Sequence, residues 1–168
     1  AGAAATAVLV FLAGTHRAGA GAFGASAIAV AHGKLQHDLV QAVALGILGN
    51  ALVCLAVWLS YGARTTTDRV VAIVLPVSAF VAAGFEHSVA NMYFFPFALC
   101  IAAFDPGFLA RPDLSTLGMG LTWSGFLVKN LLPVTLGNIL GGTLLVGAVY
   151  WFVYLRGRGE ASRPKGAR

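Results

Sequence analysis

Charged residues are scarce in this sequence: they make up 10% of 168 residues, whereas a soluble domain carries about 25%. Hydrophobic residues make up 58%, and the mean hydropathy is +0.83. So few charges could not cover the surface of a soluble globule. A disordered chain is excluded as well, because disordered segments are polar and rich in charge. The composition therefore indicates a membrane protein.

Acidic residues and cysteines are also few. Six Asp and Glu face eleven Lys and Arg, which gives a net charge of +5. The basic residues cluster in short loops and near the C-terminus, which is typical of a membrane protein, so we expect no nucleic-acid partner. Cys54 and Cys100 each lie inside an apolar run, and we expect no structural disulfide. There is no HExxH motif and no Cys/His quartet, so we expect no metal and no cofactor.

Apolar runs divide the chain into membrane segments. The runs 39–61 and 130–155 contain no charge and are long enough to cross the hydrocarbon, which needs about 20 residues. The second run ends in a cluster of aromatic residues that suits the membrane interface. Residues 1–14 are too few to span, and we expect them to be the end of a span. The chain then resembles the C-terminal part of a longer protein.

The run 70–104 is apolar throughout except for Glu86 and His87 near its middle, and it also contains Gly84 and two prolines. This predicts a broken span, two helices with non-helical backbone between about residues 80 and 86. Irregular backbone at membrane depth is tolerated only where protein or a water-filled cavity satisfies it. A break beside two ionisable residues therefore indicates a transport pathway.

The remaining segments predict how the chain is oriented. Residues 18–31 are too short to span and are expected at the interface, while 104–123 carries the turn signals of a loop. Residues 156–168 form a basic tail that we expect to be disordered. Seven basic residues lie in the 62–69 loop and this tail, against four on the other side. The positive-inside rule therefore places the C-terminus in the cytoplasm.

His87 is the first candidate for the pathway, because imidazole changes charge near neutral pH. The alternative is a purely structural hydrogen bond between helices. Neighbouring residues on a helix point about 100° apart, so Glu86 cannot face the same pore. We expect Glu86 and Gly84 to be structural at the break, with Glu86 either bonding freed backbone N–H groups or pairing with a neighbouring helix. Asn91 lies four residues after His87 and is expected to share its face.

Two more polar residues lie in or just before the run 39–61. Asn50, inside it, either binds substrate or His87 or serves as an interhelical hydrogen bond, which is common for Asn in membranes. Lys34, just before it, either concentrates anions at a pore mouth or is an ordinary snorkelling lysine at a helix end.

Three motifs resemble the formate/nitrite transporter family. Residues 49–58, GNALVCLAVW, resemble the signature of its fourth helix. Residues 75–92 contain LPV, FVA and GFEHSVANM, which resemble its broken fifth helix, and 130–142, NLLPVTLGNILGG, resemble the start of its sixth. The resemblance covers the chain up to the basic tail, from the end of the third helix through the sixth. The first repeat of the family pattern is absent.

The resemblance implies a fold and an assembly. The family has six helices per protomer in an aquaporin-like inverted repeat and forms a homopentamer with one pore per protomer. This chain would be an N-terminally truncated portion of that repeat, in the bacterial inner membrane. Gly137 and Gly141 stand in small-xxx-small register, which suits close approach of helices at a protomer surface.

The resemblance also implies a function, the conduction of small monovalent anions or their acids. The family's lysine before the fourth helix matches Lys34, its pore asparagine Asn50 and its central histidine His87. Phe80 matches an apolar constriction residue in the loop of the fifth helix, and Val53 an apolar position that shares a helical face with Asn50.

Together these features predict a channel for formate rather than an enzyme. Residues 92–96, MYFFP, look like those of formate-type members. A nitrite or hydrosulfide channel is the alternative within the family. A membrane-embedded enzyme that uses Glu86 and His87 as acid and base is an alternative of another class, and it would need a second catalytic group that is not visible. A structural subunit without a pathway is a third.

Overall fold

The computed structural model describes residues 1–118 and 120–156, and every regular element in that part is a helix. Among the described residues, two helices are long and apolar enough to cross a membrane, α3 (Leu39–Gly62) and a C-terminal helix over Gly125–Leu155. The predicted all-α membrane fold is confirmed. The C-terminal helix begins at Gly125 and not at residue 130 as predicted. Apart from Arg156, the predicted basic tail lies outside the described residues.

Capping side chains fix where the central helices begin. Asp38 Oδ1 accepts a hydrogen bond from the Gln41 N–H at 2.8 Å, which starts α3. Thr65 and Asp68 form a reciprocal capping box at the start of α4 (Thr66–Ala82).

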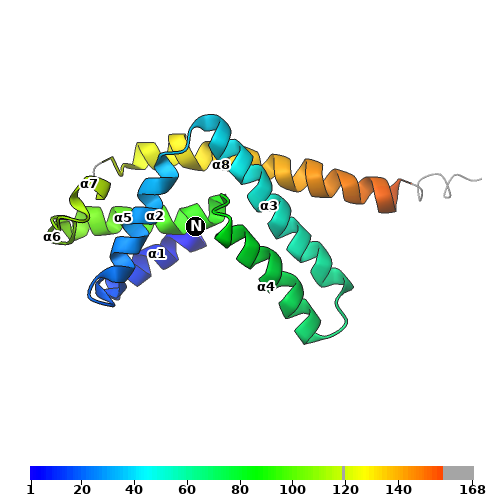
Figure 1. Ribbon diagram of the computed structural model, residues 1–168, viewed down its shortest axis with the longest axis horizontal. Helices are drawn as coiled ribbons and strands as arrows, with labels where there is room; N and C mark the ends of the chain where they lie inside the picture. Colours follow the sequence, from blue (N-terminus) through cyan, green and yellow to red (C-terminus); the bar gives the residue numbers. More distant parts are fainter. Residues whose placement is uncertain (119, 157–168) are drawn as a thin grey trace, which may run out of the picture.

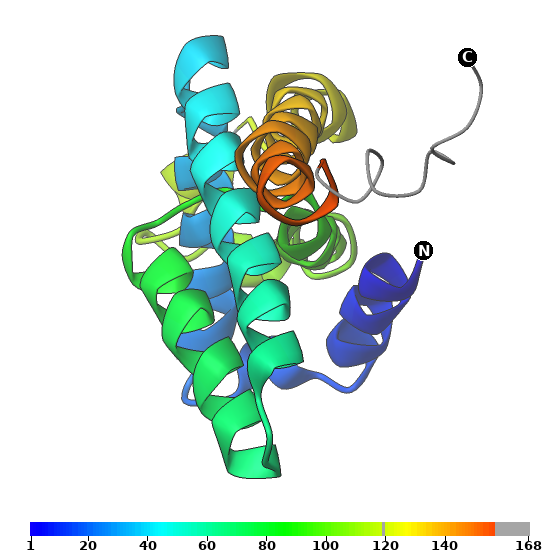
Figure 2. The ribbon, with the colours of Figure 1, turned by 90° about the vertical axis from the view of Figure 1, so that its right-hand side faces the viewer.

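The C-terminal helix consists of η2 (Gly125–Leu131), α8 (Leu132–Leu140), η3 (Gly141–Ala148) and η4 (Trp151–Leu155). In Figure 2, α3 lies between α4 and this helix.

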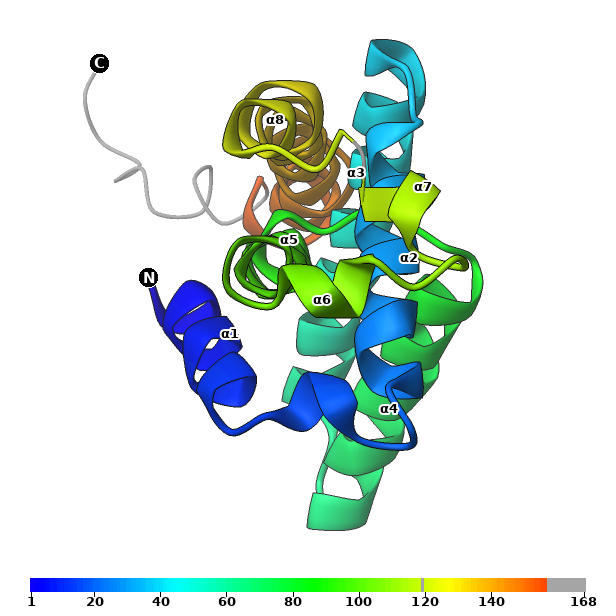
Figure 3. The same cartoon turned by 90° about the vertical axis from the view of Figure 1, so that its left-hand side faces the viewer.

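A second group of helices packs around α5 (Ser88–Phe104). Helix α1 (Gly2–Leu12) lies beside α5, as Figure 3 shows. Helix α2 (Ala22–Leu35) follows the short η1 (Thr15–Arg17) and crosses α5, as Figure 1 shows. Phe95 and Ile101 of α5 are fully buried, and Phe95 stacks on Phe126 with ring centroids 4.8 Å apart. One face of α2, including Ile28, is buried in this core, so the segment expected at the interface packs closely within the fold.

The connection after α5 contains two short helices, α6 (Pro106–Leu109) and α7 (Ser115–Gly118). Asp105 caps α6 by accepting a hydrogen bond from the Phe108 N–H at 3.3 Å. The same carboxylate contacts Arg17 at 2.7 Å and His16 at 3.1 Å. It therefore ties this connection to the chain between α1 and α2.

The predicted broken helix is present near the middle of the molecule (Figure 1). Helix α4 ends at Ala82 and α5 begins at Ser88, so the non-helical backbone covers 83–87 and starts later than the predicted residue 80. Phe80, expected in a loop, lies in the last turn of α4. Gly84 has φ +66°, a left-handed conformation that glycine adopts without strain.

Helix α3 and the C-terminal helix (α8 and the start of η3) approach each other closely through glycines. A Cβ at Gly137 would overlap the Val43 carbonyl, and a Cβ at Gly141 would overlap that of Ile47. A Cβ at Gly46 would lie 2.8 Å from the carbonyl oxygen of Val134. The expectation that Gly137 and Gly141 face another protomer is therefore wrong: they face α3 of the same chain.

Candidate functional site

A buried polar cluster surrounds Glu86, whose side chain is 1% exposed. Lys34 donates to Oε1 with Nζ at 2.7 Å, and Asn91 donates to Oε2 with Nδ2 at 2.6 Å. Asn130 Nδ2 lies 3.4 Å from the same Oε2, and His37 Nε2 lies 3.6 Å from Oε1. A buried carboxylate is tolerated only when it is paired and hydrogen-bonded, and this cluster supplies both.

Glu86 does not bond the backbone N–H groups of the break, which was the first of its two predicted roles. The Phe85 N–H donates to the Phe80 carbonyl at 3.2 Å, and the Glu86 N–H donates to the Leu45 carbonyl at 3.3 Å. Its carboxylate pairs with Lys34 of α2, which is the second predicted role, pairing with a neighbouring helix.

Lys34 had two predicted roles, a cation that concentrates anions at a pore mouth and a snorkelling lysine at a helix end, and the structure shows it paired instead. Its side chain is 15% exposed, and its ammonium group is paired with Glu86. The two charges cancel at a distance, which removes the long-range attraction for anions that was expected of Lys34. Lys34 instead joins α2 to the break.

Asn91 does not share a helical face with His87. His87 precedes α5 and has extended backbone, with φ −133° and ψ 122°, so the four-residue spacing does not apply to the pair. Asn91 is fully buried, and besides Glu86 its Nδ2 contacts Asn130 Oδ1 at 2.7 Å. Its place is in the cluster that holds Glu86.

Asn138 of α8 fixes the break and received no role in the sequence analysis. Its Nδ2 donates to the Gly46 carbonyl at 2.8 Å and the Glu86 carbonyl at 3.0 Å, while its Oδ1 accepts from the Ser88 N–H at 2.9 Å. One amide thus connects α3, the break and α5. Asn130 and Asn138 are polar amides in an otherwise apolar helix, and that was the signal available in the sequence.

Asn50 of α3 donates from Nδ2 to the Asn138 carbonyl at 2.6 Å. This is the interhelical bond, one of its two predicted roles, and the side chain remains partly exposed. Its neighbour Gly49 lets α3 approach the break, because a Cβ there would overlap the Glu86 carbonyl. Val53, one turn further along α3, is also partly exposed.

His87 packs on Phe80 and is half-buried. The two ring centroids are 6.1 Å apart and the rings stand at 77°, an edge-to-face arrangement. A titratable imidazole therefore lies at the break beside an aromatic ring. In the part of the chain that the structure describes, no three His, Cys, Asp or Glu side chains gather as metal ligands would.

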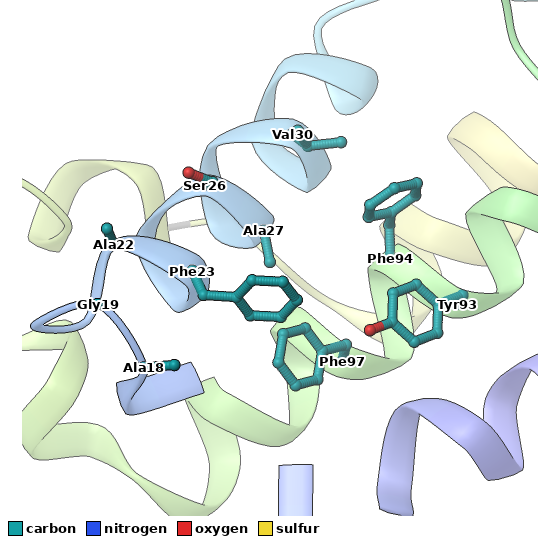
Figure 4. Close-up of a pocket in the computed structure, with 10 residues that line it drawn as sticks. All are labelled: Ala18, Gly19, Ala22, Phe23, Ser26, Ala27, Val30, Tyr93, Phe94 and Phe97. Atoms are coloured by element: carbon teal, nitrogen blue, oxygen red, sulfur yellow. The ribbon is translucent and has the colours of Figure 1, made fainter. Parts of the chain in front are cut away.

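A separate pocket of about 460 Å³ lies between α2 and α5 (Figure 4). Phe23 of α2 and Tyr93, Phe94 and Phe97 of α5 surround it, and Ser26 is one of its few polar residues. Two of these aromatic residues belong to the MYFFP motif, and Phe95 of the same motif lies in the core. The motif thus shapes the packing of α2 on α5.

Residues 1–152 match the sequence model of the family described as formate/nitrite transporters. The chain belongs to the formate/nitrite transporter family.

Relatives of this formate/nitrite transporter chain support the assignment. It is 44% identical over 151 residues to the formate channel FocA of Escherichia coli (strain K12), which covers 89% of the chain and 53% of FocA. It is 44% identical over 137 residues to the formate channel FocB of the same strain, covering 80% of the chain and 48% of FocB. The chain thus spans about half the length of these relatives.

A solved structure shares the fold of this formate/nitrite transporter chain. It is described as a pentameric formate channel with formate bound, and it superposes with a TM-score of 0.83 at 41% sequence identity. The match covers 92% of this chain and 62% of the solved one.

Proposed function

We propose that this chain forms part of a membrane channel for formate and similar small monovalent anions. The observation that carries the proposal is the break at 83–87, where non-helical backbone separates two apolar helices and the half-buried imidazole of His87 is located. The relatives named formate channels support formate as the substrate. The whole protein would be a homopentamer, multi-pass in the lipid bilayer of the bacterial inner membrane, with its C-terminus in the cytoplasm.

In the proposed mechanism the buried cluster supplies rigidity and His87 supplies chemistry. Lys34 of α2 holds the break through the Glu86 carboxylate, and Asn138 of α8 holds it through the Glu86 carbonyl. His87 and Asn50 then stabilise the substrate, while Phe80 and Val53 oppose passage of a bare charge. Proton transfer from the protonated His87 side chain to formate would give the neutral acid and a neutral imidazole, which would regain its proton from water. The neutral acid avoids most of the desolvation cost of the anion.

Lys34 takes a different role in this mechanism from the one that the sequence suggested. We place it as the partner that holds the Glu86 side chain in position, with Asn91 and Asn130 completing the hydrogen bonds. Gly84 allows the turn that leads into this arrangement.

An enzyme that uses Glu86 and His87 as an acid–base pair is disfavoured by the same geometry. The carboxylate of Glu86 is occupied by Lys34, Asn91 and Asn130, and His87 packs on Phe80 instead. A nitrite or hydrosulfide channel uses the same arrangement and differs only in the preferred anion.

The test is anion flux in liposomes that contain the full-length protein, with protein-free liposomes as the control. Formate should cross faster than nitrite or hydrosulfide at equal concentration. If nitrite or hydrosulfide crossed faster than formate, that anion would be the preferred substrate. If none of the three anions crossed, the proposed channel function would be wrong and the protein would be a structural subunit.

A further inference from the structure

Gly142 of η3 lies against two side chains of α3. A Cβ at Gly142 would stand 2.6 Å from Asn50 Nδ2 and 3.2 Å from Cys54 Sγ. The first distance is too short for two atoms that are not bonded, so the Asn50 amide would have to move. Gly137 and Gly141 differ, because a Cβ at either would meet the backbone of α3 instead. Of these three glycines, Gly142 is the one that leaves room for a side chain.

The Asn50 amide is fixed by one hydrogen bond and has others to offer. Its Nδ2 donates to the Asn138 carbonyl of the C-terminal helix at 2.6 Å. An amide has a second N–H and an oxygen that accepts. Within residues 1–118 and 120–156 no hydrogen bond uses these two groups, and the side chain is partly exposed. The bond to Asn138 thus sets the direction in which they point.

These groups suit both forms of the proposed substrate. The N–H can donate to an oxygen of formate, and Oδ1 can accept from the O–H of formic acid. A hydrogen bond weakens steeply when its donor and acceptor are misaligned. Whatever fixes the orientation of the Asn50 amide therefore affects how well it binds the substrate.

We propose that Gly142 is a positioning residue for the substrate. Because Gly142 has no Cβ, the Asn50 amide can lie against the C-terminal helix and keep its hydrogen bond to the Asn138 carbonyl. Its remaining N–H and its Oδ1 then stay directed toward formate or formic acid. In Gly142→Ala the methyl group displaces Nδ2, the bond to Asn138 is lost and the amide turns away. This role rests on the proposed channel function, since it needs a substrate at Asn50.

The test is formate flux against formate concentration in liposomes that contain the full-length protein, normalised to inserted protein. Gly142→Ala should lower the flux at low formate about two- to tenfold, as expected for one lost hydrogen bond, and should change the maximal flux less. Asn50→Ala should lower the flux at low formate at least as much. The double variant Gly142→Ala/Asn50→Ala should behave like Asn50→Ala alone, because the two residues act as one unit.

Gly137→Ala is the matched control, since it adds the same methyl group to the same helix but meets the Val43 carbonyl. It should reduce the amount of inserted protein and leave the flux per inserted protein unchanged at low formate. Unchanged flux in Gly142→Ala, an equal loss in Gly137→Ala, or additive losses in the double variant would overturn the positioning role and leave the channel function intact. If the wild type conducted neither formate, nitrite nor hydrosulfide, the channel function would fail and the positioning role with it.

The double variant also decides the case in which Gly142→Ala fails to insert into the membrane. Truncation of Asn50 removes the nitrogen that the added Cβ would overlap, so the double variant should then insert normally. If it inserted as poorly as Gly142→Ala, Asn50 would not be the side chain that Gly142 accommodates, and the proposal would be wrong.

Discussion

Lys34 and Glu86 stand 52 positions apart in the sequence and form an ion pair, with Nζ 2.7 Å from Oε1. The pair joins α2 to the break between α4 and α5. Both side chains are withdrawn from solvent, with 15% of Lys34 and 1% of Glu86 exposed. The local structure of the break thus depends on a helix that is distant in the sequence.

Replacement of Lys34 by Ala should destabilise the protein by about 3–5 kcal/mol, because it leaves a buried carboxylate without its cation. The measurement is thermal or denaturant unfolding in detergent. The double variant Lys34→Ala/Glu86→Gln should recover part of the loss, since the amide carries no charge.

Lys129→Ala is the matched control for Lys34. Lys129 is exposed, and removal of an exposed lysine usually changes stability by less than about 0.5 kcal/mol. If the Lys34→Ala protein were fully stable and its formate flux fell only at low salt, the ion pair with Glu86 would not stabilise the break. Lys34 would then act by attracting anions.

Gly137→Ala should destabilise the contact between α3 and α8 by about 1–3 kcal/mol, because the added Cβ would overlap the Val43 carbonyl. Unfolding measurements on the full-length protein test this. Gly33→Ala is the control: a Cβ at Gly33 meets nothing within 4 Å, and removal of a helical glycine should stabilise by about 0.5–1 kcal/mol. Equal effects of the two substitutions would contradict the close approach.

Gly84 should tolerate Asn better than Ala. A Cβ at Gly84 meets nothing within 4 Å, so the cost of substitution comes only from its φ of +66°. Alanine in the left-handed region costs about 1–2 kcal/mol, and asparagine less because its side chain hydrogen-bonds locally. The free energy of unfolding should therefore fall in the order Gly, Asn, Ala. The reverse order of Asn and Ala would point to a contact rather than to backbone conformation.

The Asp105 carboxylate should make stability depend on acid pH. Its hydrogen bond from Arg17, followed by that from His16, holds its pKa below the usual value. The stabilisation is therefore present above the unfolded pKa, near about 3.9, and is lost as the pH falls through the lower folded pKa.

The Asp105 prediction is tested by the unfolding midpoint between about pH 5 and pH 3, the range around the unfolded pKa of an aspartate. The wild type should lose more stability over this range than Asp105→Asn. Asp113→Asn is the control, because Asp113 pairs with Arg111 in an exposed position. If the unfolding midpoint fell with pH equally in the wild type and in Asp105→Asn, the contacts of Asp105 with Arg17 and His16 would not contribute to stability.

The sequence predicted those features that depend on local composition. An apolar run without charge predicted α3 almost to the residue, and Gly84 beside two ionisable residues predicted the break. The start of the break was wrong because α4 continues through Phe80, and no residue between Phe80 and Ala82 disfavours a helix strongly enough to end it there.

The sequence could not predict which polar residues meet. The role of Lys34 depends on α2 crossing α5, a tertiary arrangement that no local pattern encodes. Asn91 was misplaced because the spacing rule for helices was applied to His87, which lies outside the helix. Asn138 bonds three segments at once, and from the sequence it looked like any polar amide in an apolar run.

His87 should determine how formate flux depends on pH. Imidazole titrates near neutral pH, whereas an amide forms hydrogen bonds without titrating in this range and a phenyl ring does neither. His87→Asn should therefore retain more conduction than His87→Phe, and both should lose the pH dependence that the wild type shows. The measurement is formate flux against pH in liposomes, normalised to membrane-inserted protein.

The control for His87 is His32→Asn. His32 also carries an imidazole ring, but its Nδ1 lies 3.0 Å from the Leu117 carbonyl and its Nε2 lies 3.3 Å from Gln36 Nε2, away from the break. Its replacement should leave the pH profile of flux unchanged. If the wild type and both His87 variants gave one and the same profile, the imidazole would be a packing partner of Phe80 and proton transfer would not occur there. If the pH profile changed in His32→Asn and not in the His87 variants, the pH dependence of flux would come from a residue of α2.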